Sequence, residues 1–163
     1  MRPFQDARLE EIEALYRSRF PYFVQVATAI VGEQELAVEA VQDAFAGVVR
    51  GRRSFRGDGP LEAWIWRAVV NAAYNVRRHA GATTAHVDVP EGQSNGYERE
   101  GSEVGAQIAL LPDRQKLALF LRYYADLDYR SIAAALGIEV GTVSATLSAA
   151  HASLRRALGK VER

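Results

Sequence analysis

The side chains best suited to chemistry in this sequence are basic, aromatic and amide groups between residues 50 and 78. A loop with four arginines and one phenylalanine, RGRRSFRGDGP (50–60), comes first. After it, five side chains recur at helical spacing and share one face: Trp64, Arg67, Asn71, Asn75 and Arg78. Arginine can hold phosphates, aromatic rings can stack on unpaired bases, and asparagine amides can read base edges. These residues suit single-stranded nucleic acid, and a polar outer face with a core tryptophan fits them equally well.

A second group of polar side chains is acidic. Glu35, Glu39 and Asp43 follow one another at intervals of four residues, which places them on one side of a helix. On spacing alone, a solvated face near the positive end of the helix dipole explains them best. The alternative is a docking face for a basic partner.

The strongest local pattern predicts a helix-turn-helix between Tyr129 and Val143. The small side chain of Ala133 lets two helices cross closely, and Gly137 can adopt the left-handed conformation of a turn. Apolar residues that would lock the two helices together are Ile132, Leu136, Ile138 and Val143. The second helix of such a unit normally enters the major groove of DNA. An ordinary helical hairpin is the less favoured alternative.

An enzyme is the class of protein that the sequence supports least. It has no cysteine, no nucleophile–base pattern, no phosphate-binding loop and no cluster with metal-ligand spacing. His151 is a candidate for a pH or metal switch, but His79 and His86 are distant in sequence. A groove-facing or solvated histidine is therefore favoured. We expect neither a cofactor nor a bound metal.

Helices must position these groups, because apolar side chains recur at helical spacing in both halves of the chain. In the N-terminal half the pattern predicts helices over 9–20 and 23–31, separated at Pro21, and over 36–48 and 61–76. Nothing alternates with period two for long, so no sheet is expected.

The C-terminal half continues the helical pattern. Pro112 suits a first helical position, and apolar residues follow at core spacing over 117–124. A short helix is expected near 129–136 and a longer one from about Gly141. The chain is therefore predicted to be all-α.

The composition predicts two small helical domains, residues 1–79 and 106–163, joined by a flexible linker over 80–105. The linker is rich in Gly, Ser, Thr and Glu and lacks an apolar period. The formal net charge of the 163 residues is zero, which at first argues against nucleic acid. The linker holds one basic and five acidic residues, however, so the flanking domains are neutral to basic.

Several features predict a soluble cytoplasmic protein without membrane insertion. Apolar residues make up 48% of the chain, which is enough for a packed core. The absence of cysteine fits a reducing compartment. The N-terminus has no apolar signal core, and the longest apolar stretch, 22–31, contains Gln25 and is too short to span a bilayer.

Three segments resemble the extracytoplasmic-function (ECF) subfamily of the sigma-70 family, the sigma factors of bacterial RNA polymerase. The polymerase-docking helix of that family is similar to VEAVQDAF (38–45). Its −10 recognition segment is similar to SFRGDGPLEAWIWRAVVNAAYNVRR (54–78), and its −35 domain to LPDRQKLALFLRYYADLDYRSIAAALGIEVGTV (111–143). The resemblance extends from about Leu15 to Leu158, and three motifs in this order around a linker are highly specific.

The resemblance implies two contacts with core RNA polymerase. Glu39, Gln42 and Asp43 match positions that dock on the coiled coil of the largest subunit. The flap of the second-largest subunit would meet three positions: Leu117, Phe120 and Leu121. The linker would pass through the polymerase toward the RNA exit path. An anti-sigma factor is a common further partner in the family.

The resemblance also implies two contacts with promoter DNA. At the −10 element, the loop from Phe55 to Gly59 would capture a flipped base. Asn71 and Asn75 would face the melted non-template strand, and Arg77 and Arg78 would hold nearby phosphates. The implied −10 residues are Phe55, Arg56, Gly57, Asp58, Trp64, Arg67, Asn71, Asn75, Arg77 and Arg78. The implied −35 residues are Tyr129, Arg130, Thr142, Ser144, Ala145, Thr146, Ser148, His151 and Arg155.

The sequence departs from the family pattern in two places. Segment 144–151 contains no Arg or Lys, although the family usually carries several there. Basic residues follow further along, at Arg155, Arg156 and Lys160. A bidentate contact from arginine or lysine to a base is worth about 1–3 kcal/mol, and this segment can make none. We therefore expect weak or unusual recognition of the −35 element. Recognition of the −10 element or a partner protein would compensate for this loss. Leu36 and Val38 stand at often acidic positions, which predicts weaker or activator-dependent docking.

The leading hypothesis is an alternative sigma factor that binds core polymerase and directs promoter-specific transcription initiation. The second is a sigma-like regulatory protein that acts mainly through protein–protein contacts, which the absence of Arg and Lys from segment 144–151 favours. A dimeric helix-turn-helix repressor would leave residues 35–78 unexplained.

Overall fold

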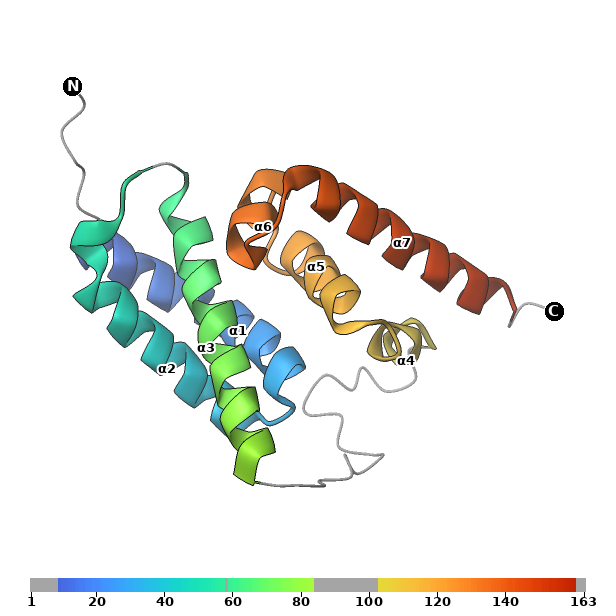
Figure 1. Cartoon of the computed structure of the whole chain (residues 1–163), viewed down its shortest axis with the longest axis horizontal. Helices are drawn as coiled ribbons and strands as arrows, with labels where there is room; N and C mark the ends of the chain where they lie inside the picture. Colours follow the sequence, from blue (N-terminus) through green and yellow to red (C-terminus); the bar gives the residue numbers. More distant parts are fainter. Residues whose placement is uncertain (1–8, 58, 84–102, 161–163) are drawn as a thin grey trace.

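The computed structural model describes residues 9–57, 59–83 and 103–160. These residues form two helical domains (Figure 1). The N-terminal domain contains α1 (Leu9–Val31), α2 (Gln34–Arg50), the 3-10 turn η1 (Arg52–Ser54) and α3 (Leu61–Thr83). The C-terminal domain contains α4 (Glu103–Ala109), α5 (Asp113–Tyr123), α6 (Tyr129–Leu136) and α7 (Val140–Gly159). No strand occurs in the described parts of the chain, so the all-α prediction is confirmed.

An aromatic cluster holds the three long helices of the N-terminal domain together. The ring of Phe23 in α1 lies 4.4 Å from that of Trp66 in α3 and 5.2 Å from that of Phe45 in α2, measured between centroids. The side chains of Phe23 and Trp66 are fully buried. Burying a large apolar side chain contributes roughly 1.5–3 kcal/mol, so this cluster fixes the orientation of α3 on the other two helices.

The first helix differs from the sequence prediction. α1 runs through Pro21 without interruption, where we expected two helices. Proline lacks the N–H of one helical hydrogen bond and costs roughly 3 kcal/mol in a helix interior. Ile12, before Pro21, and Phe23, after it, are buried in the same core. The free energy gained by burying both flanking segments therefore exceeds the local cost of the proline, and α1 continues through it.

The helix-turn-helix prediction is confirmed in the C-terminal domain. The side chain of Asp128 caps α6 by accepting a hydrogen bond of 2.7 Å from the backbone N–H of Ser131. At the other end, Gly137 adopts the left-handed conformation with φ of 67°. The backbone N–H of Ile138 then donates to the carbonyl of Ala133, which closes the helix end. α6 and α7 meet at an angle of 100°.

Helical structure extends into both ends of the segment predicted as a linker. α3 continues to Thr83 and α4 already begins at Glu103. The remainder of that segment, residues 84–102, lies outside the described residues. Within the described ranges, no single helix has the length and hydropathy of a membrane span, and α6 with α7 passes only as a bent pair.

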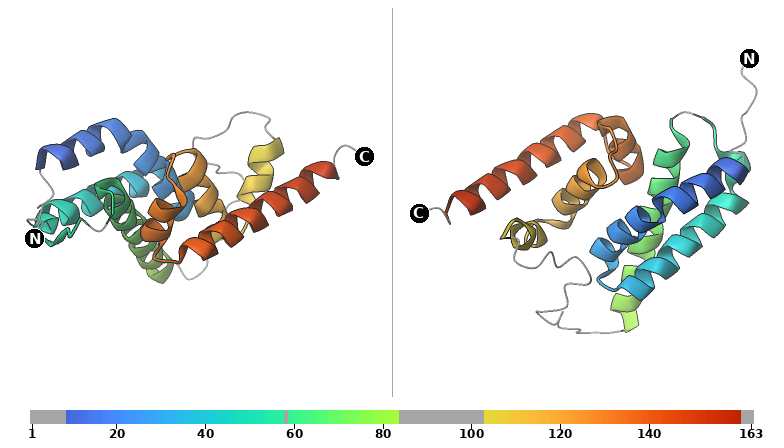
Figure 2. Two further views of the ribbon diagram at one scale, coloured as in Figure 1. Left: turned by 90° about the horizontal axis from the view of Figure 1, so that it is seen from above. Right: turned by 180° about the vertical axis from the view of Figure 1, so that it is seen from behind.

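The two domains pack on each other through α3 with α6 and α1 with α5. Buried apolar side chains of both domains form one contiguous core. In the three views, α6 lies beside the N-terminal half of α3, and α7 extends away from the N-terminal domain (Figure 2). The C-terminal domain is therefore docked beside the helix that carries the candidate base-reading residues.

Candidate nucleic-acid interface

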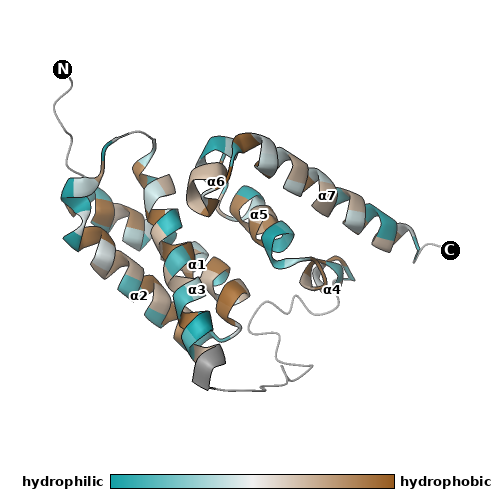
Figure 3. Cartoon of the chain, in the orientation of Figure 1, coloured by the Kyte–Doolittle hydropathy of each residue, from teal (hydrophilic) through white to brown (hydrophobic). Residues whose placement is uncertain are grey.

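Helix α3 presents a polar stripe to solvent. Its apolar face, which includes Ile65, Trp66, Val69 and Ala73, is buried against α1 and α2. The opposite side carries Asn71, Asn75 and Arg78, all exposed. Hydrophilic residues recur along α3 in Figure 3. The structure thus brings these sequence-predicted residues together on one accessible surface.

A local hydrogen-bond network orders the C-terminal end of this stripe. Arg78 donates from Nη2 to the Oδ1 atom of Asn75. The Nδ1 atom of His79 lies 2.8 Å from the backbone carbonyl of Asn75. The contact with Arg78 directs the amide oxygen of Asn75 toward the guanidinium, so the two side chains present a joint polar surface.

The loop before α3 packs its phenylalanine on the tryptophan at the edge of the stripe. The rings of Phe55 and Trp64 lie 5.2 Å apart between centroids. The hydroxyl of Ser54 donates to the carbonyl of Gly51 over 2.6 Å, and Gly57 adopts a positive φ of 72°. Asp58, another predicted −10 residue, lies outside the described residues.

An open hollow of about 320 Å³ lies between this loop and α3. Its lining residues are Ser54, Phe55, Arg56, Gly59, Pro60, Ala63, Trp64, Arg67 and Ala134. The volume is at the low end of the roughly 300–1,000 Å³ range of small-ligand pockets. Eight of the nine residues come from the N-terminal domain, whereas Ala134 belongs to α6.

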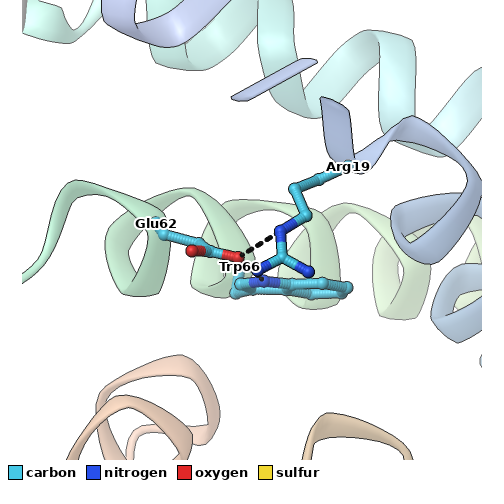
Figure 4. Close-up of polar contacts among 3 residues, drawn as sticks. All are labelled: Arg19, Glu62 and Trp66. Carbon is cyan, nitrogen blue, oxygen red and sulfur yellow. Dashed lines mark hydrogen bonds and ion pairs between the residues drawn. The ribbon is translucent and has the colours of Figure 1, made fainter. Parts of the chain in front are cut away.

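A polar contact that the sequence did not suggest fixes the start of α3 to α1. The Nε atom of Arg19 lies 3.2 Å from Oε1 of Glu62, which also accepts a hydrogen bond of 3.4 Å from the indole N–H of Trp66 (Figure 4). A buried indole N–H normally needs such an acceptor. Sequence spacing gave no signal for Arg19, because it pairs across two helices.

Two arginines predicted to touch DNA reach toward the C-terminal domain, although both remain exposed to solvent. The Nη1 atom of Arg77 lies 2.8 Å from Oδ2 of Asp113 in α5. A Cβ atom added at Gly137 would lie 3.8 Å from Nη2 of Arg67, so that guanidinium reaches the helix-turn-helix. Burial raises the pKa of the neighbouring Tyr74 phenol, and the Asp113 carboxylate raises this pKa further, against the opposing effect of Arg77.

The predicted docking residues lie on the outer face of α2. Glu39, Gln42 and Asp43 are exposed, whereas the opposite face of α2 is buried. Val38 is half-buried and packs against the core, which accounts for an apolar residue at that position.

An apolar hollow of about 650 Å³, which the sequence analysis missed, adjoins this face of α2. Its lining residues are Leu9, Ile12, Glu13, Tyr16, Gln42, Phe45, Ala46, Val49 and Arg50. Gln42 therefore belongs to both the exposed polar face and the hollow. Only the packing of α1 against α2 reveals this surface.

The predicted flap-contact residues differ in accessibility. Leu117 and Leu121 are buried in the core, with 3% and 0% of their surface exposed, and Phe120 is half-buried. The surface at this place is formed by Tyr123 and Tyr124, which fall in the segment 117–124 that the resemblance assigns to the flap. An apolar hollow of about 230 Å³ lies here, lined by Ile108, Leu119, Phe120, Tyr123, Tyr124, His151 and Leu154.

The exposed face of the recognition helix α7 is small and uncharged over its first half. Thr142, Ser144, Ala145 and Ser148 are exposed there. Thr146 is half-buried, and its hydroxyl donates to the carbonyl of Thr142 over 2.7 Å. In Figure 3, the first half of α7 shows pale and brown bands, and teal bands appear toward its C-terminal end.

The other predicted −35 residues surround this face. Tyr129, Arg130 and Arg155 are exposed. The Nε2 atom of His151 lies 2.9 Å from the hydroxyl of Tyr123 in α5, so this ring nitrogen is engaged within the domain. Over the described ranges, no group of three or more His, Asp or Glu side chains is placed to hold a metal ion.

Comparison with known proteins is consistent with this arrangement. Residues 15–83 match Sigma-70 region 2, and residues 102–158 match Sigma-70, region 4. The ECF RNA polymerase sigma-E factor of Escherichia coli (strain K12) is 30% identical over 134 residues, covering 71% of this chain and 70% of that protein. The ECF RNA polymerase sigma factor SigM of Mycobacterium tuberculosis (strain H37Rv) is 30% identical over 150 residues, covering 90% of this chain and 76% of that protein.

A solved structure has the same fold. The sigma factor RpoE from Bartonella quintana, solved in complex with the anti-sigma factor NepR, superimposes with a TM-score of 0.71 at 21% identity. The match covers 95% of this chain and 100% of that one.

Proposed function

The chain belongs to the ECF subfamily of the sigma-70 factors, and on that premise we propose which of its residues serve each step of initiation. As an alternative sigma factor, it binds core RNA polymerase and directs transcription from particular promoters. The observation that carries the residue assignment is the exposed stripe of Asn71, Asn75 and Arg78 beside the hollow at Phe55 and Trp64.

The hollow receives one base of the melted −10 element. A base turned out of the duplex loses its stacking partners and gains from an aromatic wall and nearby hydrogen-bond donors. Phe55 with Trp64 supplies the wall, and Arg56 supplies positive charge at the rim. Asn71 and Asn75 then contact the edges of the neighbouring unpaired bases, while Arg78 holds a phosphate.

The outer face of α2 docks on the coiled coil of the largest polymerase subunit. Glu39 and Asp43 offer negative charge to a basic partner, and the hollow beside Gln42 offers apolar area. Complementary charges at the rim of an apolar interface fix the relative orientation of the two partners and raise their association rate. This combination suits an amphipathic helical partner.

The apolar hollow of the C-terminal domain docks on the flap of the second-largest subunit. Phe120, Tyr123 and Tyr124 give it an aromatic lining that remains accessible. Aromatic residues in a pocket are typical anchors of protein interfaces. Leu117 and Leu121 support this surface from the core.

The C-terminal domain reads the −35 element weakly. Serine, threonine and alanine on the exposed face of α7 make few base contacts and no charged phosphate contact. The affinity for promoter DNA therefore comes mainly from the residues of α3 and its preceding loop that contact the −10 element, and from the polymerase. Acting with the polymerase, the protein works in the cytoplasm.

An anti-sigma factor regulates the chain by covering its polymerase-binding surfaces. The structural relative RpoE is bound to NepR, and CnrH, a second structure with the same fold, is bound to the cytosolic domain of CnrY. The two apolar hollows described above are suitable anchor points for such a partner.

The alternative function, a sigma-like regulatory protein, is favoured by the uncharged first half of α7. Run-off transcription separates the two. Purified bacterial core polymerase is mixed with the chain and a library of promoter fragments with randomised −10 and −35 elements. Specific initiation with an enriched −10 sequence supports the assignment made here, whereas tight polymerase binding without initiation supports the regulatory protein.

A further inference from the structure

Asn75 and Arg78 form a hydrogen-bonded pair on the exposed stripe of α3. Helical periodicity predicts a helix that ends near residue 76, but α3 continues to Thr83, so both residues lie on regular helix. Side chains three residues apart are neighbours on a helix surface. The Nη2 atom of Arg78 donates a hydrogen bond to Oδ1 of Asn75, and both side chains are exposed. The pair is therefore accessible to a base of the melted strand.

The chemistry of arginine decides which end of the Asn75 amide faces outward. A guanidinium has only N–H donors and no acceptor, so it bonds to the oxygen of the amide and not to the nitrogen. The two ends of an amide group diverge, and the N–H2 group of Asn75 therefore points away from Arg78. The hydrogen bond to Asn75 uses one donor of Arg78. A ligand consequently meets a surface of N–H donors.

Such a donor surface divides the four bases into two classes. Guanine and thymine carry a carbonyl oxygen where adenine and cytosine carry an amino group. The carbonyl can accept a hydrogen bond from the pair, whereas the amino group brings one donor against another. Asparagine usually reads adenine by accepting from N6 and donating to N7. Asn75 is poorly placed to do so, because its oxygen faces a guanidinium whose positive charge repels the amino group.

Asn71 provides an internal comparison on the same stripe. It is exposed and lies four residues before Asn75. Seven positions separate it from Arg78, which is about 10 Å along the helix, so Arg78 does not set the orientation of the Asn71 amide. Asn71 can therefore offer both its donor and its acceptor to a base, and it remains suited to adenine.

We propose that Arg78 is a specificity-determining residue: by holding the amide oxygen of Asn75, it makes this pair select guanine or thymine over adenine or cytosine in the melted −10 strand. The proposal rests on the proposed function, since it specifies which bases the same stripe accepts. It also gives Arg78 a role beyond holding a phosphate, because a phosphate contact carries no sequence information.

Run-off transcription from promoter fragments with a randomised −10 element measures this preference. The fragments that are transcribed by reconstituted holoenzyme are sequenced, and the position that loses its preference in Asn75→Ala is the one that Asn75 reads. The wild type is expected to enrich guanine or thymine at this position at least about fivefold over adenine and cytosine.

Two substitutions of Arg78 then separate its donors from the rest of the site. Arg78→Met removes the donors and is expected to raise the frequency of adenine at that position at least about fivefold. Arg78→Lys is the matched control, because an ammonium group also has donors and no acceptor, and it should retain the preference for guanine or thymine. Loss of a phosphate contact lowers the yield from all fragments alike, so it does not change the base frequencies.

A further variant tests the orientation of the amide while Arg78 is kept. Asn75→Asp has nearly the same shape, and its carboxylate can bond Arg78 through one oxygen and present the other, an acceptor, to the base. The preference at this position is expected to reverse toward adenine or cytosine. Both positions are exposed, so the variants should fold, and circular dichroism with polymerase binding verifies this.

Equal base frequencies in Arg78→Met and Arg78→Lys, or an unreversed preference in Asn75→Asp, would overturn the inference. If the wild type initiates specifically but no position responds to Asn75→Ala, the inference and the base contact of Asn75 both fail, while promoter-directed initiation stands. If the wild type enriches no sequence at all, the proposed function itself fails and the inference falls with it.

Discussion

The rings of Phe55 and Trp64 lie 5.2 Å apart between centroids, with their planes tilted by 43°. This pair ties the glycine-containing loop to the first turn of α3. An aromatic pair of this kind is worth roughly 0.5–1.5 kcal/mol beyond its area burial. Phe55→Ala should therefore lower the free energy of unfolding by about 1 kcal/mol, measured by urea denaturation, and reduce promoter opening.

Phe55→Tyr keeps the ring and serves as the control for this substitution. It should retain both stability and promoter opening. Promoter opening at the wild-type rate in the alanine variant would show that the aromatic wall does not hold the flipped base.

Reversing the charge on the outer face of α2 should weaken polymerase binding. Glu39→Lys places a positive charge toward the basic partner and is expected to weaken binding by about tenfold, mainly in the association rate. Glu10→Lys, at an exposed position in the first turn of α1, is the control for net charge. Surface plasmon resonance with core polymerase measures both, and equal affinities would remove α2 from the docking site.

The uncharged first half of α7 leads to a gain-of-function prediction. Thr146→Arg with Ala149→Arg should tighten binding to duplex −35 DNA at least about fivefold and make binding more dependent on salt. The control variant adds two arginines elsewhere, by Ala14→Arg and Gln34→Arg. Fluorescence anisotropy over a range of salt concentrations tests the difference. Equal affinity of the two double variants would show that α7 does not approach DNA.

The cap of α6 makes a small, pH-dependent contribution to stability. The hydrogen bond from the backbone N–H of Ser131 lowers the pKa of the Asp128 carboxyl below its ordinary 3.8. Because the folded-state pKa is the lower one, the stabilisation is present above the unfolded pKa and is lost as the pH falls through the folded pKa. Asp128→Ala should therefore cost about 1 kcal/mol at neutral pH.

Urea denaturation at pH 7 and pH 3 measures this contribution. The difference between wild type and Asp128→Ala should shrink at the lower pH, and Asp128→Asn should stay close to wild type at neutral pH, because its amide oxygen still accepts the bond. A difference that is the same at both pH values would contradict an ionised cap.

Local features of this fold were predictable from the sequence. The bounds of α6 and the left-handed turn at Gly137 are determined by residues close together in the chain, so the local sequence was sufficient to predict them. The stripe of Asn71, Asn75 and Arg78 follows from helical periodicity in the same way.

Features that depend on distant residues were not predictable. The continuity of α1 through Pro21 is decided by burial against α2 and α3. Helical spacing alone also could not show that Leu117 is covered while Tyr123 is exposed. Arg77 pairs with Asp113 of the other domain, and no pattern of neighbouring residues in the sequence predicts this ion pair.

The assignment of −10 reading to α3 is tested most directly by permanganate footprinting of promoter DNA with reconstituted holoenzyme. Asn71 is exposed and lies outside the core, so Asn71→Ala should leave folding and polymerase binding unchanged. The account predicts about tenfold or greater loss of thymine reactivity in the −10 region, on the basis of one lost base contact of about 1–3 kcal/mol. Wild-type reactivity in a variant that still binds polymerase would contradict it.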